Sequence, residues 1–209
     1  DLEDAIEANE SVLKSYSIIN TDRSALATLF GHLAERVSID RLSTFKSEVK
    51  TDKAYKGKIQ LNFHGSAGQS FGVFQTSEVE IRLEGEANDY VGKSMNGGSI
   101  TIFPNTKTNF EIEGNSIVGN TVLYGATGGS LFASGAAGER FCVRNSGALT
   151  VVEGVGDHAC EYMTGGEVYI IGPVGKNLGA GMSGGIAYIY NQNKNIIDQV
   201  NDEMVYIDK

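Results

Sequence analysis

The sequence predicts an all-β fold, a parallel β-helix of about six to seven coils with a short N-terminal helical segment. The first observation behind this prediction is a glycine-ended turn that recurs ahead of a short strand. The last residues of these turns are Gly98, Gly129, Gly147, Gly166 and Gly185, with steps of 31, 18, 19 and 19 residues between them. Units this short cannot bury their own apolar faces, so they must stack on their neighbours.

The second observation is alternation within each repeat. The positions two and four residues beyond each turn are apolar in every copy, with Ser77 ending a weaker first turn. They are Val79, Ile81, Ile100, Ile102, Leu131, Ala133, Leu149, Val151, Val168, Ile170, Ala187 and Ile189. A period of two places all of these side chains on the inner face of a strand. The third observation is composition, because 27 glycines and only 2 prolines in 209 residues are typical of a turn-rich β protein.

Residues 1–57 differ from the repeat and are predicted to be a helical cover and connector. Residues 2–13 have helical spacing with acidic residues in the first turn, and residues 16–20 form a short β-like run. Thr21 or Asp22 can cap a second helix. Its apolar stripe would be Ala25, Leu26, Leu29, Phe30, Leu33 and Val37. Residues 38–57 lack periodicity and are expected to connect this helix to the repeat.

The β-helix domain is predicted to span residues 58–209 and to end in a short C-terminal tail. Residues 58–65 alternate Ile59, Leu61 and Phe63 with polar side chains, as the opening strand of the repeat would. The step from Gly98 to Gly129 is longer than the others, which predicts a loop around residues 106–115.

The chain shows no motif that predicts catalysis, cofactor binding or a metal site. Residues 87–94 fit a loose phosphate-binding loop, but a strand follows them where such a loop needs a helix. His32, His64 and His158 are scattered without ligand spacing, and Asp157-His158 is not a triad signal. We therefore expect no catalytic, cofactor-binding or metal-ligating residues in this chain.

Charge and cysteine usage narrow the class of partner. A net charge of −9 argues against a nucleic-acid or anionic membrane surface, and no apolar run is long enough to span a membrane. With two cysteines and no signal peptide, the expected location is the cytoplasm. Cys142 and Cys160 each lie four residues beyond a glycine, so we expect buried, reduced thiols on neighbouring coils.

The outward column three residues beyond each turn is less polar than a solvent-facing column should be. It reads Phe132, Thr150, Tyr169 and Tyr188, with Ile171, Ile186 and Tyr190 nearby. Exposed apolar surface of this kind usually has a partner. Either the chain's own helices or tail cover it, or another domain or subunit docks there. The candidate docking face consists of Phe132, Tyr169, Tyr188 and Tyr190.

Long irregular strings around the glycines closely resemble the C-terminal glycine-repeat (GXGXG) domain of the glutamate synthase large (alpha) subunit. The strings include residues 20–23 (Asn-Thr-Asp-Arg), 65–72, 83–93, 143–147, 156–158 (Gly-Asp-His), 160–166 and 180–187. The resemblance runs from about residue 16 to the last residue. It implies a right-handed, single-stranded β-helix without catalytic residues of its own.

The resemblance also implies a role and partners. The domain would be a scaffold between the glutaminase and synthase domains or subunits of glutamate synthase, which makes two glutamates from glutamine and 2-oxoglutarate. FMN and an iron–sulfur cluster are expected on those partner domains, and the chain is either one domain or a separately encoded subunit. The alternatives are an assembly subunit like the one of formylmethanofuran dehydrogenase that has a related repeat and, from another class, a carbohydrate-active β-helix. The latter would need a groove of carboxylates and basic residues, which the outward columns lack.

Overall fold

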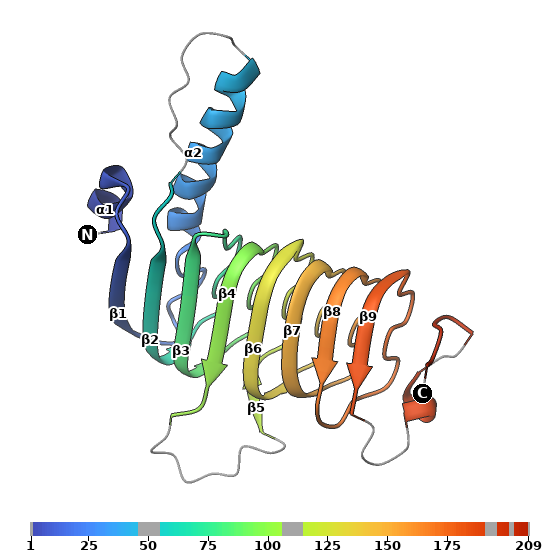
Figure 1. Ribbon diagram of the computed structural model, residues 1–209. Helices are drawn as coiled ribbons and strands as arrows, with labels where there is room; N and C mark the ends of the chain where they lie inside the picture. The colour runs from blue at the N-terminus through green and yellow to red at the C-terminus, as the bar shows by residue number, and fades with distance from the viewer. Residues whose placement is uncertain (1, 46–54, 106–114, 191–195, 201–202, 209) are drawn as a thin grey trace.

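The computed structural model is a parallel β-solenoid of about six turns with few helices (Figure 1). It describes residues 2–45, 55–105, 115–190, 196–200 and 203–208. Eight strands lie side by side, each parallel to its neighbours, and the short β5 (Ser116–Val118) pairs with β3 and β6. In order the eight are β1 (Val12–Ile18), β2 (Ile59–Ala67), β3 (Val79–Ala87), β4 (Asn96–Phe103), β6 (Gly128–Ala137), β7 (Ser146–Val155), β8 (Thr164–Ile170) and β9 (Gly184–Ile189). The predicted fold class is confirmed.

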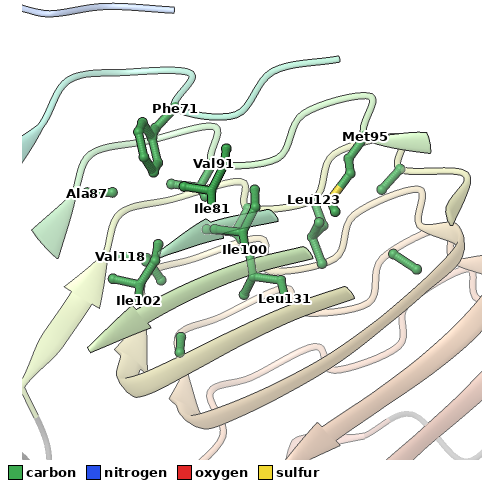
Figure 2. Close-up of a cluster of buried hydrophobic side chains, with 14 of the residues drawn as sticks. Phe71, Ile81, Ala87, Val91, Met95, Ile100, Ile102, Val118, Leu123 and Leu131 are labelled. Atoms are coloured by element: carbon green, nitrogen blue, oxygen red, sulfur yellow. The ribbon is translucent and has the colours of Figure 1, made fainter. Parts of the chain in front are cut away.

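The core is a stack of inward side chains, one layer from each coil. Ile81, Ile100 and Leu131 occupy the same inward column on β3, β4 and β6, and all three are fully buried (Figure 2). Each buried aliphatic side chain of this size stabilises the fold by roughly 1.5–3 kcal/mol. The turns add further buried residues to the same cluster, among them Phe71, Val91 and Leu123. Stacked layers therefore bury apolar surface that no single coil could bury.

Glycine is required where the strands bend at a corner. Gly65 and Gly85 are paired neighbours on β2 and β3, with φ values of 131° and 148°. A Cβ atom on Gly85 would lie 1.8 Å from the carbonyl oxygen of Gly65, and one on Gly65 would lie 2.1 Å from that of Ile18. The backbones at this corner therefore approach too closely for any side chain.

Each coil has two walls. One is the strand, and the other is a turn segment in which every second residue has a positive φ, which we call the turn wall. Arg140, Cys142 and Arg144 have φ values of 60°, 59° and 57°, and neighbouring coils repeat the pattern. Such conformations cost about 1–2 kcal/mol per non-glycine residue. Hydrogen bonds between coils hold them in place: the Arg140 N–H donates to Asp157 O and the Cys142 N–H to Val122 O, both at 2.8 Å. No sequence signal marks this wall, because most of its positive-φ residues are not glycine.

The first helix is shorter than its sequence pattern predicted. Helix α1 (Leu2–Ala8) ends at Asn9, which has a φ of 60°, and the Glu10 N–H donates to Ala5 O at 2.9 Å. Asparagine tolerates this left-handed conformation, which is a common way to end a helix. Val12 and Leu13, predicted to extend the helical stripe, instead begin β1.

The second helix begins later and ends later than predicted. Helix α2 spans Ala27–Phe45, so the prediction of a connector from residue 38 was wrong up to residue 45. Periodicity reports which face packs, whereas helix propensity depends on the residue types, and residues 38–45 contain neither Pro nor Gly, so the polar stretch still folds as helix. Its buried contacts come from Phe30 and Leu33. The Val37 side chain lies outside the described residues.

Residues 22–26, before α2, belong to the turn wall of the first coil. The Ser24 N–H donates to Gln69 O at 2.8 Å, while Asp22 Oδ2 accepts from the Ile19 N–H at 3.0 Å. Neither Thr21 nor Asp22 therefore caps α2. A single 3₁₀ turn, η1 (Ile196–Gln199), follows the last strand in the described part of the chain.

The sheet begins before the opening strand expected at residue 58. Strand β1 pairs with β2 from Val12↔Ile59 to Ile18↔Gly65, so α2 is inserted between the first two coils. The division into residues 1–57 and 58–209 stays a prediction about folding units. The loop predicted around residues 106–115 lies outside the described residues except for Asn115.

In strand β7 the repeat lies one residue later than the sequence predicted. Leu131 pairs with Thr150 and Thr150 with Val168, so Ala148, not Gly147, occupies the turn position of this coil. Thr150 is fully buried and its Oγ1 donates to Leu131 O at 2.8 Å. Leu149 and Val151, predicted to point inward, face outward. The prediction failed because it made Gly147 the glycine that ends the turn, as Gly129 and Gly166 do in the neighbouring coils. A shift of one residue exchanges the two faces of a strand.

Candidate docking face

The outward column of the sheet becomes apolar from β6 onward. The register joins Thr101, Phe132, Val151, Tyr169 and Tyr188 in one row across five strands, with Val151 in the place predicted for Thr150. Flanking outward positions add aliphatic and aromatic side chains. We call the set the apolar face: Phe132, Leu149, Val151, Tyr169, Ile171, Ile186, Tyr188 and Tyr190.

Much of the apolar face is open. The exposed fractions are 39% for Phe132, 45% for Tyr188 and 63% for Tyr190, with Ile171 and Ile186 also about half exposed. Helices α1 and α2 lie at the β1–β3 end of the row (Figure 1). These residues therefore do not show cover by the chain's own helices. The C-terminal tail, the other part of that alternative, lies beside the face, since Ile197, Met204 and Tyr206 line one hollow with Tyr169, Tyr188 and Tyr190.

Aromatic stacking gives the face a defined shape. The rings of Tyr169 and Tyr188 stack with centroids 4.6 Å apart and planes 14° apart. The Tyr169 hydroxyl donates to Glu167 Oε2 at 2.8 Å. This hydrogen bond to the carboxylate is the main cause that raises the pKa of Tyr169. Stacking and this hydrogen bond thus hold the ring pair in one arrangement.

The same face is polar over β2 and β3. Gln60 donates to Glu80 Oε2 at 3.1 Å, and His64 Nδ1 lies 3.0 Å from Glu84 Oε2. The Arg82 guanidinium lies over the Phe103 ring, 5.6 Å from the ring centroid, at the boundary between the polar and the apolar parts of this face. One sheet face is therefore divided into a charged, internally paired half and an apolar half.

The motifs rejected on sequence grounds have structural roles. After Ala87 the chain enters the turn wall with no helix, and Asp89 Oδ1 accepts from the Asn120 N–H at 2.7 Å, so this is not a phosphate-binding loop. His158 Nδ1 lies 2.7 Å from Glu161 Oε1 across one turn.

Among the described residues no group of His, Cys, Asp or Glu is arranged to hold a metal ion. In the same part of the chain, no helix is long and apolar enough to cross a membrane.

The two cysteines lie as the sequence predicted. Cys142 and Cys160 are fully buried free thiols on adjacent coils, and the Cys160 N–H donates to Phe141 O at 2.7 Å. Burial raises the pKa of Cys160 to about 12 and that of Cys142 well above its ordinary value. Two neutral buried thiols are not a donor set for an iron–sulfur cluster, which takes about four thiolates.

We expect neither thiol to react in the folded protein, because the thiolate is the reactive form and both pKa values are raised. Incubation with a maleimide at pH 8 should label no cysteine in the native chain and both after unfolding in urea. Rapid labelling of one thiol in the native chain would contradict the buried arrangement.

The raised thiol pKa values also predict a pH dependence. The unfolded thiols ionise near their ordinary value of 9, while folded Cys160 holds its proton to about 12. Stability from this group is therefore complete below pH 9 and is lost as pH rises from 9 towards 12. The free energy of unfolding should fall less steeply across this range in Cys160→Ala than in the unchanged chain, measured by urea titration at several pH values.

Comparison with known proteins places the chain in a family. The family model described as "GXGXG motif" matches residues 1–209. The chain is 51% identical over its full length to a ferredoxin-dependent glutamate synthase of Pyropia yezoensis and 46% identical to ferredoxin-dependent glutamate synthase 2 of Synechocystis. A glutamate synthase [NADH] of Schizosaccharomyces pombe is 51% identical over 190 residues, 91% of this chain and 8% of that protein.

The chain spans only 13% of the length of the first two relatives. It therefore corresponds to one region of proteins that carry much more polypeptide. The match of the family model along the whole chain, together with the solenoid that its repeats build, shows that this chain belongs to the GXGXG motif family.

Proposed function

We propose that this chain is a non-catalytic structural domain or subunit of a glutamate synthase, and that the apolar face docks it to the remainder of the enzyme. The observation that carries this proposal is the identity of 46–51% over the whole chain to proteins named glutamate synthase, in which the chain is a small part. The overall reaction would be that of glutamine with 2-oxoglutarate and a reduced donor to give two glutamates.

The architecture supports a scaffold role. The solenoid is stiff along its length, because every coil is bonded to its neighbours through the strands and through the turn wall. A stiff body with one apolar sheet face can hold two other domains at a fixed separation. Glutaminase and synthase domains, with FMN and an iron–sulfur cluster, would then reside on other parts of the enzyme. The cytoplasmic location stays a prediction.

The scaffold proposal predicts that the chain alone does not turn over substrate. Purified residues 1–209 incubated with glutamine, 2-oxoglutarate and reduced ferredoxin, or with NADH, should form no glutamate above the rate without protein. A ferredoxin-dependent glutamate synthase assayed in parallel verifies the reagents. Glutamate formation that stays with the chain through further purification would contradict the proposal.

A further inference from the structure

The last coil leaves its part of the core unfinished. On β8 the inward Val168 and Ile170 are completely buried. Their neighbours in the next layer, Ala187 and Ile189 on β9, are only partly buried although they occupy the same columns. The inner face of β9 therefore lacks the strand layer that covers every earlier coil. Ile196 and Val200 of the C-terminal segment pack against the core, but Ala187 and Ile189 stay only partly buried.

The backbone of β9 is also open on one side. Within the described residues β9 pairs with β8 alone, and Figure 1 shows it as the last arrow of the row. The Tyr190 N–H donates to Ile170 O at 2.9 Å, so alternate residues of β9 face β8. Parallel pairing directs the N–H and C=O of the intervening residues, Ala187 and Ile189, to the open side. An edge of this kind is a template for another strand.

The C-terminal segment covers a different wall of the last coil. The Leu178 N–H donates to Gln199 O at 3.0 Å, and Leu178 forms a parallel bridge with Val200. A groove of about 1330 Å³ lies between this segment and β9, lined by Ala187, Ile189, Met182, Ile196 and Val205 among others. It exceeds the roughly 300–1,000 Å³ of a small-molecule pocket and borders the open edge of β9, as a site for an extended peptide would.

We propose that the β9 edge binds an extended segment of a partner polypeptide as one more parallel strand. Aliphatic side chains at alternate positions of that segment complete the core over Ala187 and Ile189. An aromatic or aliphatic side chain between them packs on Tyr188, as Tyr188 packs on Tyr169. The site is the edge of β9, and the groove beside it also borders Tyr169, Tyr188 and Tyr190 of the apolar face. The proposal does not depend on the assignment to glutamate synthase.

A second copy of this chain fits the edge less well. The only other sheet edge in the described residues is β1, so two copies would join β1 to β9 and continue as an open fibre. Lys14 lies in the inward column of β1, paired with Leu61. Stacking β1 on β9 would set a lysine in the layer that needs an aliphatic side chain, and inward charges of this kind protect edges against such pairing.

A peptide with the sequence of residues 164–171, Thr-Gly-Gly-Glu-Val-Tyr-Ile-Ile, is a suitable probe because it has the columns of a coil. On the open side of β9, in the register of the other coils, its valine and first isoleucine would lie over Ala187 and Ile189. Added to the full chain, it should slow amide exchange at Ala187 and Ile189 at least tenfold, as followed by NMR. The N–H groups of Tyr188 and Tyr190 face β8 and should not change. The same peptide N-methylated at its tyrosine should not bind, because in this register that amide donates to Ala187 O.

A matched pair of variants separates edge binding from folding. Ala187→Pro removes an N–H that faces the open side, a position where edge strands tolerate proline. It should keep the native circular dichroism and lose peptide binding, whereas Ile19→Ser, a change at an exposed residue just beyond β1 at the other end of the sheet, should keep both. Unchanged exchange at Ala187 and Ile189 with the peptide at millimolar concentration would overturn the proposal. So would strong protection of these amides in the free chain, which would mean that the chain itself or a second copy already covers the edge.

Discussion

Gly85→Ala should lower the free energy of unfolding by about 3 kcal/mol or more. The added Cβ would lie 1.8 Å from Gly65 O and 2.8 Å from its carbonyl carbon. Both are backbone atoms of the adjacent coil, so no side chain can move aside to relieve the contact. The φ of 148° adds backbone strain that alanine does not tolerate. Urea unfolding followed by far-ultraviolet circular dichroism measures the change.

Gly125→Ala is the matched control for Gly85→Ala. Gly125 also has a positive φ, 64°, but a Cβ there would meet nothing within 4 Å. Only backbone strain remains, about 1–2 kcal/mol. Equal losses in the two variants would show that close approach of the coils is not what requires glycine at the corner.

The proposed docking role predicts that the double variant Tyr169→Asp/Tyr188→Asp no longer binds the remainder of a glutamate synthase, without unfolding of the chain. It replaces a stacked ring pair, half exposed at Tyr188, with two like charges opposite each other at the centre of the apolar face. Burying two unpaired carboxylates in an interface costs far more than the lost contacts. The tagged chain should no longer co-elute from its native source with polypeptides that mass spectrometry identifies as glutamate synthase. If both regions are one polypeptide, the same loss appears as separation of the domains after limited proteolysis.

Two controls locate this effect. Ser15→Asp/Asn62→Asp adds the same charges in the same outward column on β1 and β2, away from the apolar face, and should keep co-elution. Tyr169→Phe removes only the hydroxyl bonded to Glu167 and should also keep it. Loss of co-elution in the β1–β2 variant, or its persistence in the double aspartate variant, would mean that the partner contacts another surface.

Much of the fold was predictable because stacked coils repeat the same constraint in every copy. The inward positions Ile100, Leu131 and Val168 each stand two residues beyond a glycine that ends a turn, and each is fully buried. The weaker first turn was placed two residues too early, because Ile81, four residues beyond Ser77, pairs with Ile100. The cysteines were placed correctly for the same reason, since their spacing from Gly138 and Gly156 is equal. Helix ends were less predictable, because Asn9 and the turn at residues 22–26 are decided by contacts with other coils.

The candidate docking face was predictable in its residues but not in its exposure. Phe132, Tyr169, Tyr188 and Tyr190 could be assigned to outward positions from alternation alone. Whether α2 folds back over them depends on where it leaves the first coil, and this is set by the pairing of β1 with β2. The edge of β9 had no sequence signal, because its inward residues have the same apolar character as those of the buried coils.

The sequence by itself determined the repeat, the parallel stacking, the inner columns of most strands and the family of the chain. The first three follow from a period of about 19 residues and from alternation within each unit, and the family follows from the long strings of residues around the glycines. Only the tertiary structure decided which face of β7 is inside, where the first coil begins and which apolar side chains stay open to a partner. The reason is that register and exposure depend on what lies above and below each coil: a slip of one residue exchanges the faces of a strand, and only the neighbouring coil fixes it.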